Sequence, residues 1–241
     1  MMKDSVVIIP TYNEIENIEA IVKAVFAQSD ALHILVVDDN SPDFTSAKVK
    51  ELQNEFSNRL FLEVRQEKSG LGTAYIHGFK WAFEKKYDYI FEMDADFSHN
   101  PTDLIKLYNA CKLEGASLSI GSRYKTGVNV VNWPMNRVLM SYLASKYVRL
   151  ITGMQIHDTT AGFVCYKREV LETIDLNTIK FIGYAFQIEM KFKAYLKGFK
   201  IIEVPVIFTD RTKGVSKLSG GIISEAIFGV ITMKLKSLFK K

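Results

Sequence analysis

Short apolar runs alternate with segments of helical periodicity along the first half of the chain. Residues 5–9 form an uninterrupted run of mostly β-branched residues that ends at Pro10, which is typical of a strand buried on both faces. Residues 14–28 repeat apolar positions at intervals of three and four, as an amphipathic helix does. The same alternation predicts further strands at 32–37, 60–64, 87–93 and 116–120, with helices at 44–56, at 72–85 and after Pro101.

Five strands separated by helices predict an α/β fold: a Rossmann-like mixed, mostly parallel sheet with helices on both faces. In open sheets of this kind, ligands bind where the strands reach their carboxyl ends. We therefore expect five segments to meet at one edge of the sheet, namely residues 10–14, 38–43, 65–72, 94–98 and 121–124.

The second half of the chain predicts a helical elaboration of the same domain. A long amphipathic helix is expected at 132–152, and a polar segment follows it as far as Phe163. A helix at 184–197, a strand at 200–208 and a last apolar helix at 221–239 complete the pattern. Because no repeat, low-complexity tract or linker interrupts the sequence, we expect a single domain spanning residues 1–241.

Composition places the chain among ordinary globular proteins. Hydrophobic residues make up 48% and charged residues 24%, and no uncharged run approaches the roughly 20 residues of a membrane-spanning helix. The first residues lead into a strand without an apolar signal region, so we expect a protein on the cytoplasmic side. Cys111 and Cys165 lie too far apart for a metal motif, which suits a reducing compartment.

The net charge of +4 is unevenly distributed. Beyond Asp210 the chain carries seven Lys or Arg residues and a single acidic residue, Glu225. Such a segment is either a solvated tail or the binding surface for an anionic partner, which could be a phosphate or a lipid surface.

Two carboxylates follow the fourth predicted strand. Asp94 and Asp96 are two residues apart, so in an extended chain both side chains point to the same side. Hard cations such as Mg²⁺ bind to one or two carboxylates together with waters and substrate phosphates. On its own, however, such a pair is more often a solvated acidic turn than a metal site.

Two further segments at the expected edge carry polar chemistry. The acidic residues of 38–43 could accept hydrogen bonds from a ribose or a base, or could cap the helix that follows. Residues 68–73 combine Lys68 with glycines that allow the backbone to approach a ligand closely. The segment lacks a Walker sequence, and no Gly-X-Gly-X-X-Gly follows the first strand, which excludes both phosphate-binding motifs.

Six segments taken together resemble the polyprenol-phosphate (dolichyl-phosphate) mannose synthases, which are inverting glycosyltransferases of family 2 with the GT-A fold. The resemblance runs in order from about residue 5 to residue 218. It implies a nucleotide-sugar donor, usually GDP-mannose, a divalent cation such as Mg²⁺ or Mn²⁺, and a membrane lipid monophosphate as acceptor, with no nucleic acid. The motifs are Pro10-Thr-Tyr-Asn-Glu14, Val36-Val-Asp-Asp-Asn-Ser-Pro-Asp43, Gly70-Leu-Gly-Thr-Ala74, Met93-Asp-Ala-Asp-Phe-Ser-His-Asn-Pro101, Gly121-Ser-Arg-Tyr124 and Asp158-Thr-Thr-Ala-Gly-Phe163.

The resemblance also implies roles for particular residues and divides the chain into a donor half (5–124), an acceptor half (125–218) and a C-terminal amphipathic helix (219–241). Asp94 and Asp96 would hold the metal, joined weakly by Ser98, where part of the family has Gln. With Arg123 and Arg211 these two carboxylates are the candidate catalytic residues. The nucleotide sugar would contact Pro10, Tyr12, Glu14, Asp39, Lys68 and Gly70. A loop at 209–219 would close over its phosphates and contribute Arg211 and Lys217. The acceptor phosphate would contact Arg123, Arg137 and Ser141.

The residue types at these positions suit a reaction without a general base. A lipid monophosphate is mostly dianionic at pH 7, because its second pKa is about 6. The nucleophile therefore needs no proton removed, but its charge must be neutralised and its oxygen oriented towards the sugar. Arginine guanidiniums can do both, and a metal ion stabilises the departing diphosphate. Asp158 is then a candidate for positioning the sugar or the arginines. The four histidines have no ligand spacing, and we expect them to be structural.

A lipid acceptor gives the basic C-terminal segment a second interpretation. The helices at 132–152 and 221–239 could lie on the membrane surface, or they could pack into the core. In the first case Lys234, Lys236, Lys240 and Lys241 would face anionic headgroups. We would then expect a peripheral protein on the cytoplasmic face of the membrane, with or without a membrane-anchoring partner protein.

Other functions share parts of this pattern. The same fold could use UDP-glucose or another donor, or could transfer sugar to a glycan. A non-catalytic nucleotide-binding module is the alternative from another class. The presence of both the metal carboxylates and the phosphate-binding cations disfavours that last alternative.

Overall fold

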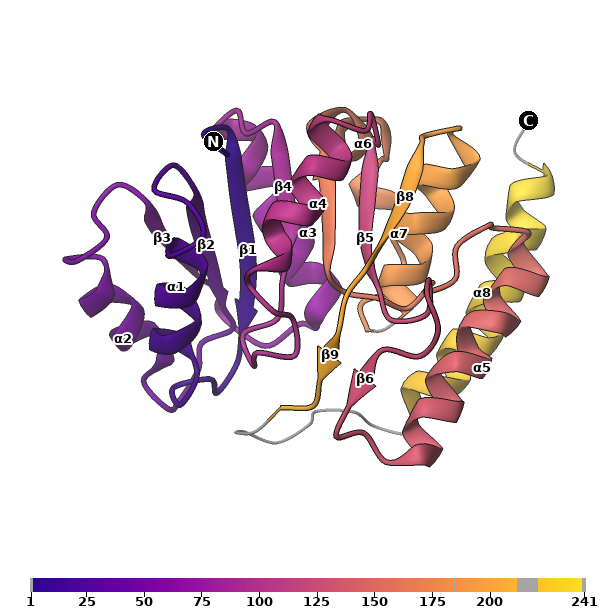
Figure 1. Ribbon diagram of the computed structural model, residues 1–241, viewed down its shortest axis with the longest axis horizontal. Coiled ribbons are helices and arrows are strands. Elements are labelled where there is room, and N and C mark those ends of the chain that lie inside the picture. The colour runs from indigo at the N-terminus through magenta and orange to yellow at the C-terminus, as the bar shows by residue number, and fades with distance from the viewer. Residues whose placement is uncertain (1, 184, 212–220, 240–241) are drawn as a thin grey trace.

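The computed structural model describes residues 2–183, 185–211 and 221–239, with the backbone alone for 221–227. In this part of the chain, seven strands form one sheet in the order β3-β2-β1-β4-β7-β5-β8 (Figure 1). Neighbouring strands are parallel except at β7, which runs antiparallel to both β4 and β5. The strands are β1 (Ser5–Thr11), β2 (His33–Asp38), β3 (Leu60–Val64), β4 (Tyr89–Glu92), β5 (Leu118–Ser122), β7 (Val164–Lys167) and β8 (Ile201–Pro205), and a separate parallel pair consists of β6 (Val130–Val131) and β9 (Phe208–Thr209).

Helices cover both faces of the sheet, as the alternating pattern predicts (Figure 1). One face carries α1 (Ile18–Phe26), α2 (Thr45–Leu52) and α4 (Asp103–Lys112), and the other carries α3 (Leu71–Glu84), α6 (Arg168–Thr173) and α7 (Ala185–Leu196). The short helix η1 (Leu176–Thr178) follows α6. Two long helices, α5 (Met135–Thr152) and α8 (Gly221–Phe239), lie side by side beyond the β8 edge of the sheet.

Alternate residues of the central strands feed two separate hydrophobic cores. Val6 and Ile8 of β1 point into the core under α3 and α7, whereas Val7 and Ile9 point into the core under α1 and α4. This follows from the two-residue period of a strand. Because the full burial of each such side chain stabilises the fold by about 1.5–3 kcal/mol, the uninterrupted apolar run fixes β1 at the centre of the sheet.

The expected fold class is confirmed, but two strands, β7 and the two-residue β6, were missed and another was predicted too long. The antiparallel strand β7 was not predicted, because it is short and directly follows the polar segment that ends at Phe163. The predicted strand 200–208 ends at Pro205, because its partner β5 ends at Ser122, whose carbonyl accepts the last bond of the ladder from Val206 N at 3.1 Å. The chain resumes pairing only at β9, on β6.

Two helices begin later than predicted. The chain from Glu14 forms a turn in which the Glu14 carbonyl accepts from the backbone N–H groups of Asn17 and Ile18, and α1 starts at Ile18. The helix α5 starts at Met135 rather than at 132 because Pro134 takes the N-cap position and disfavours helical backbone at the residue before it.

A buried polar cluster lies inside the core below β4. Gln187 of α7 donates from Nε2 to Glu92 Oε2 at 2.6 Å, and its Oε1 accepts from Lys191 Nζ at 3.1 Å. Lys191 also donates to the Ala161 carbonyl at 2.6 Å. All three side chains are almost completely buried. Burial therefore raises the pKa of Glu92 to about 8 and lowers the pKa of Lys191 to about 8.

The raised pKa of Glu92 predicts a pH dependence of stability. A folded-state pKa above the unfolded value of 4.5 gives stability that is complete below about pH 4.5 and is lost as the pH rises towards about 8. Glu92→Gln keeps an acceptor for Gln187 and cannot ionise. Its melting temperature should therefore rise relative to wild type by several degrees between about pH 5 and about pH 8.

Thermal melts followed by circular dichroism across that pH range measure the difference. Glu84→Gln removes an exposed carboxylate at the end of α3 and serves as the control. A difference between Glu92→Gln and wild type that stays constant with pH would contradict the assignment.

Candidate active site

The carboxyl ends of the parallel strands meet at one edge of the sheet, the lower edge in Figure 1, which we call the carboxyl edge. Loops from three strands are joined there by hydrogen bonds. Asn13 N donates to Ser41 Oγ at 3.0 Å, and Asn40 Nδ2 donates to the Gln66 carbonyl at 3.2 Å. The loops after β1, β2 and β3 thus lie together, as the predicted parallel sheet requires.

The residues predicted to hold the nucleoside gather at this edge. Lys68 Nζ lies 4.4 Å from the centroid of the Tyr12 ring, which is a cation–π contact. Glu14 and Asp39 are both buried, and Pro10 lies at the end of β1. In the 38–43 segment, it is Asp43 that accepts from Thr45 N at the start of α2, so Asp39 is not needed as a cap.

Arg65, which sequence reasoning left without a role, ties this group together. Its Nε donates to Asp39 Oδ1 at 2.6 Å and its Nη1 donates to Thr73 Oγ1 at 2.7 Å. Burial raises the pKa of Asp39, although the Arg65 charge acts in the opposite direction. The pattern could not reveal this residue, because a single Arg after a strand carries no motif.

Different structural constraints require the two glycines of the 70–73 turn. Gly70 has a φ of 99°, a conformation that other residues rarely adopt. At Gly72 a Cβ would lie 2.7 Å from the Phe186 ring, so this glycine allows α3 to pack against α7. Close packing therefore explains Gly72, where the sequence suggested room for a ligand.

Asp94 and Asp96 follow β4 at the carboxyl edge. The Asp94 side chain is 39% exposed, whereas that of Asp96 is 6% exposed. Ser98 N donates to Asp96 Oδ1 at 3.0 Å across Phe97, whose φ of 61° turns the chain sharply. The turn brings Ser98 next to Asp96, as expected for a candidate third member of the metal site.

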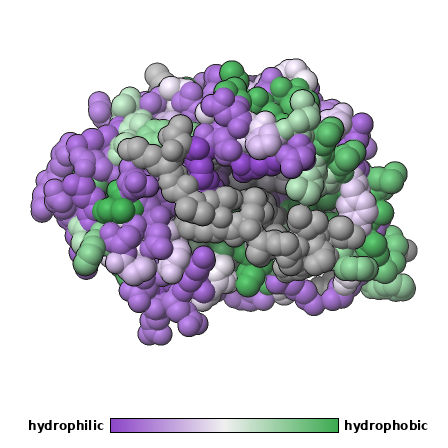
Figure 2. Space-filling model, turned by 90° about the horizontal axis from the view of Figure 1, so that it is seen from below, coloured by the Kyte–Doolittle hydropathy of each residue, from purple (hydrophilic) through white to green (hydrophobic). Residues whose placement is uncertain are grey.

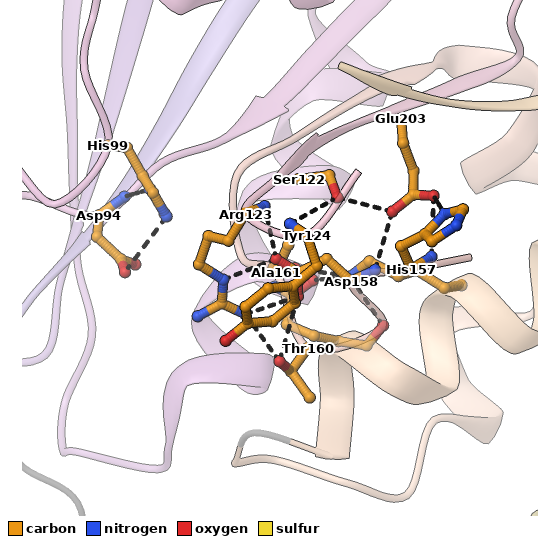
Figure 3. Close-up of polar contacts among 12 residues, drawn as sticks. Asp94, His99, Ser122, Arg123, Tyr124, His157, Asp158, Thr160, Ala161 and Glu203 are labelled. Carbon is orange, nitrogen blue, oxygen red and sulfur yellow. Dashed lines mark hydrogen bonds and ion pairs between the residues drawn. The ribbon is translucent and has the colours of Figure 1, made fainter. Parts of the chain in front are cut away.

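His99 fixes the backbone of Asp94. Its Nδ1 accepts from Asp94 N at 3.1 Å, and its Nε2 lies 4.0 Å from Asp94 Oδ2 (Figure 3). The ring stacks on Phe163 at 4.8 Å, and burial lowers the pKa of His99 to about 4, so the imidazole is neutral at pH 7. His99 makes structural contacts, as predicted for the histidines. Because it lies beside Asp94, however, it is also part of the candidate site.

Arg211, two residues after β9, reaches the carboxylate of Asp96. Its Nη2 lies 2.8 Å from Asp96 Oδ2. Burial by itself raises the pKa of Asp96, but hydrogen bonds from Ser98 and the charge of Arg211 outweigh it and lower the pKa below its usual value. The loop residue predicted for the donor phosphates thus contacts a predicted metal ligand.

Arg123 follows β5 and is held by Asp158. The guanidinium donates from Nε to Asp158 Oδ2 at 2.7 Å and from Nη2 to Asp158 Oδ1 at 2.6 Å, and also to Thr160 Oγ1 at 2.8 Å (Figure 3). Burial opposes the ionisation of Asp158, but the Arg123 charge and hydrogen bonds lower its pKa below the usual range. Asp158 therefore positions an arginine, one of the two roles predicted for it.

Glu203 of β8 supports this pair and was not recognised in the sequence. Its carboxylate accepts from the backbone N–H groups of His157 and Asp158, from His157 Nδ1 and from Ser122 Oγ, all within 2.9 Å (Figure 3). The side chain is 4% exposed. Glu203 thereby fixes the loop that carries Asp158 against the strand that carries Arg123.

The remaining predicted acceptor residues lie on α5. Arg137 Nη1 donates to Asp210 Oδ1 at 2.8 Å, and Ser141 follows one helical turn later. Asp210 immediately precedes Arg211, whose backbone N–H also bonds to Asp210 Oδ1, at 3.0 Å. Two consecutive residues therefore connect the Asp94–Asp96 region with α5. Lys217 and most of the predicted loop 209–219 lie outside the described residues.

The donor set at Asp94 and Asp96 suits a magnesium-type ion. Within residues 2–183, 185–211 and 221–239, no three His, Cys, Asp or Glu side chains converge to hold a metal. Two carboxylates two residues apart in the sequence, one of them partly exposed, match the small protein contribution that such an ion needs when substrate phosphates complete its shell. Oxygen ligands alone also favour Mg²⁺ or Mn²⁺ over softer metals.

Comparisons with known proteins agree with the resemblance seen in the motifs. The glycosyl transferase family 2 model matches residues 6–175. The polyprenol monophosphomannose synthase of Mycolicibacterium smegmatis is 48% identical over 94% of this chain and 85% of that protein. The undecaprenyl-phosphate mannosyltransferase of Micrococcus luteus is 43% identical over 92% of this chain and 90% of that protein.

A solved structure shows that the fold is shared as well. The mannosyltransferase of Pyrobaculum calidifontis, in complex with GDP-Man and Mn²⁺, superposes with a TM-score of 0.61. The match covers 98% of this chain and 74% of that one at 18% identity. From its family match and its curated relatives, the chain belongs to glycosyltransferase family 2.

Proposed function

We propose that the protein transfers mannose from GDP-mannose to a polyprenyl phosphate, with Mg²⁺ or Mn²⁺ as cofactor. The names of the two curated relatives support this acceptor and this sugar. The GDP-Man and Mn²⁺ bound to the mannosyltransferase of shared fold support the donor and the kind of metal. In this proposal residues 5–124 form the donor half, residues 125–218 the acceptor half, and residues 219–241 a helix at the membrane.

The observation that carries the proposal is a line of ion pairs across the carboxyl edge. Asp96 pairs with Arg211, and the adjacent Asp210 pairs with Arg137, each at 2.8 Å. Carboxylates suited to a metal and guanidiniums suited to a phosphate thus lie in one connected group. A reaction between a metal-bound diphosphate and a second phosphate needs this combination.

On the donor side, the diphosphate would lie between Asp94, Asp96 and Arg211. The two carboxylates would hold the divalent ion, which supplies Lewis-acid stabilisation of the negative charge on the departing diphosphate. Tyr12, Asp39 and Lys68 would hold the nucleoside at the ends of β1 and β2. His99 keeps Asp94 in place through the backbone bond described above.

On the acceptor side, Arg123, Arg137 and Ser141 would bind the lipid phosphate. A phosphate oxygen bonds to the anomeric carbon as the bond from that carbon to the diphosphate breaks, and the electron pair leaves with GDP. Because the phosphate is already dianionic at pH 7, no side chain has to remove a proton. The guanidiniums neutralise the nucleophile and direct it at the sugar.

The alternatives predict different substrates at the same residues. UDP-glucose or another nucleotide sugar would occupy the donor half, and a glycan acceptor would have no phosphate for Arg123 and Arg137 to bind. A non-catalytic nucleotide-binding module would need neither arginine. The buried, hydrogen-bonded position of Arg123 favours a functional phosphate site over a solvated surface charge.

The outer surface of α5 and α8 supports contact with the lipid membrane. Figure 2 shows apolar residues gathered at the side formed by these helices, next to the carboxyl edge. No helix in the described part of the chain is long and apolar enough to span a membrane. The exposed apolar side chains are Met135, Leu139, Met140, Leu143 and Leu150 of α5 and Phe228, Ile231, Leu235, Leu238 and Phe239 of α8.

The two interpretations of these helices, core packing and membrane contact, concern different faces. Val230 is buried and Gly229 lies against Phe181, so the inner face of α8 packs into the protein. The outer face is available for a membrane. Lys234 does not point to headgroups, because its Nζ donates to the Thr152 carbonyl at 3.2 Å and ties α8 to α5. Lys240 and Lys241 lie outside the described residues.

A substrate panel tests the proposed function directly. The protein is incubated with labelled GDP-mannose, UDP-glucose and other nucleotide sugars, with Mg²⁺ or Mn²⁺ and a polyprenyl phosphate. We expect label in the organic phase from GDP-mannose only, and Asp96→Ala should lower that transfer at least 100-fold because it removes a metal ligand. Transfer from another donor, or to a glycan, would replace the proposal.

Metal binding without a donor tests the placement of Arg211. Because its guanidinium occupies Asp96 Oδ2, a divalent ion must displace it. Arg211→Gln should therefore bind Mn²⁺ alone several-fold more tightly, measured by electron paramagnetic resonance of free Mn²⁺, while transfer falls about tenfold or more. Lys197→Gln, which removes an exposed charge just after α7, should change neither. Unchanged or weaker Mn²⁺ binding would contradict this competition.

Liposome flotation tests the membrane surface. Wild-type protein should float with anionic vesicles at low salt, and the double variant Leu143→Asp, Leu235→Asp should not, because it places charges on the outer face of α5 and α8. Leu113→Asp, at a still more exposed leucine beyond α4, is the control and should float. Flotation of all three proteins alike would assign membrane binding to another surface.

A further inference from the structure

Trp133 lies between the two arginines proposed for the acceptor phosphate. The Arg137 guanidinium carbon is 4.1 Å from the centroid of its ring, and that of Arg123 is 5.5 Å from the same centroid. The indole also packs edge-on against Phe208 of β9, with the ring centroids 5.0 Å apart. A single side chain therefore contacts both guanidiniums and the strand that leads to Arg211.

The backbone holds this indole at a fixed place. Trp133 follows Asn132, whose φ of 62° turns the chain out of β6, and precedes Pro134, the N-cap residue of α5. Arg137 N donates to the Pro134 carbonyl at 3.0 Å in the first turn of that helix. Trp133 and Arg137 are thus parts of one rigid corner.

The contacts solve an electrostatic problem that a phosphate site creates. Two guanidiniums that converge on one phosphate repel each other before the phosphate binds. Asp158 and Asp210 offset this repulsion, and the electron-rich face of an indole attracts both cations further. The ring therefore keeps both arginines in place without adding a negative charge that would repel the phosphate.

The indole N–H adds a second observation. Trp133 Nε1 is buried, and within the described residues it has no hydrogen-bond acceptor. A buried donor of this kind is unusual in a folded protein. A phosphate oxygen held beside Arg123 and Arg137 would accept this hydrogen bond.

We propose that Trp133 completes the acceptor-phosphate site: its ring positions Arg123 and Arg137, and its Nε1 donates to the bound phosphate. This inference rests on the proposed function, because it takes the two arginines as the phosphate-binding pair. It adds a residue that no motif pointed to. Because Trp133 would contact the bound phosphate, its fluorescence emission should change when a prenyl phosphate binds.

Intrinsic fluorescence reports on Trp133 without turnover. The chain has two tryptophans, and Trp81→Phe leaves Trp133 as the only one. Trp81 packs on Phe61 and Tyr87, away from the carboxyl edge. Citronellyl phosphate, a short prenyl monophosphate, should change the Trp133 emission in a saturable manner, and citronellol should not. An unchanged emission in a preparation that transfers sugar to citronellyl phosphate would overturn the proposal.

Two variants separate the ring from its N–H group. Trp133→Phe keeps an aromatic face and loses the donor, and should raise KM for citronellyl phosphate about threefold. Trp133→Leu loses both and should raise it about tenfold or more, which is the scale of the loss of a cation–π contact and a hydrogen bond. The kcat and the KM for the donor should stay within about twofold of wild type.

The pattern of effects distinguishes a phosphate-binding role from a structural one. Equal losses for donor and acceptor, with a lowered melting temperature, would show that Trp133 only supports the fold and would overturn the proposal. Unchanged acceptor KM in both variants would do the same. If GDP-mannose proved to be the wrong donor, the fluorescence response to the prenyl phosphate would be unaffected, so failure of the proposed function is distinguishable.

Discussion

The bidentate bond between Arg123 and Asp158 is the contact on which the proposed acceptor side of the site depends. Both side chains are buried, so removing either one leaves an unpaired charge inside the protein. The loss of one partner of such a pair typically lowers the stability of the fold by about 3–5 kcal/mol. The bond joins the loop after β5 to the loop before β7. It exists because β7 lies antiparallel between β4 and β5, which brings residues 158–163 to the carboxyl edge.

A polar layer inside the protein keeps this contact in place. Glu203 holds the backbone of His157 and Asp158 from one side, and Lys191 holds the Ala161 carbonyl from the other. Both supporting side chains are nearly inaccessible to solvent, so water cannot replace their hydrogen bonds. The loop before β7 is therefore fixed through its backbone, which explains how a polar segment without regular structure can hold an arginine at a defined position.

Much of the donor half could be predicted from the sequence because its information is local. The apolar runs of β1 and β2 identify buried strands, and the motif around Asp94 comes directly after β4 in the sequence. The supporting residues could not be found in this way. Arg65, Glu203 and Asp210 are single charged residues outside the motifs. Their bonds to Asp39, Ser122 and Arg137 span 26, 81 and 73 positions of the sequence, respectively. Likewise, β7 is defined by its neighbours in the sheet, and its four residues carry too short a pattern.

The arginines of the site differ in how firmly their carboxylates hold them, and this difference fits their roles. The Arg123 and Asp158 side chains are 9% and 0% exposed, whereas those of Arg137 and Asp210 are 26% and 24% exposed. A partly solvated pair contributes about 1 kcal/mol or less, so a dianionic phosphate can displace Asp210 from Arg137 at little cost. The buried pair cannot exchange in this way. In the proposed phosphate site Arg123 would therefore be the fixed part, while Arg137 and Arg211 would be the cations able to change partners as substrates bind.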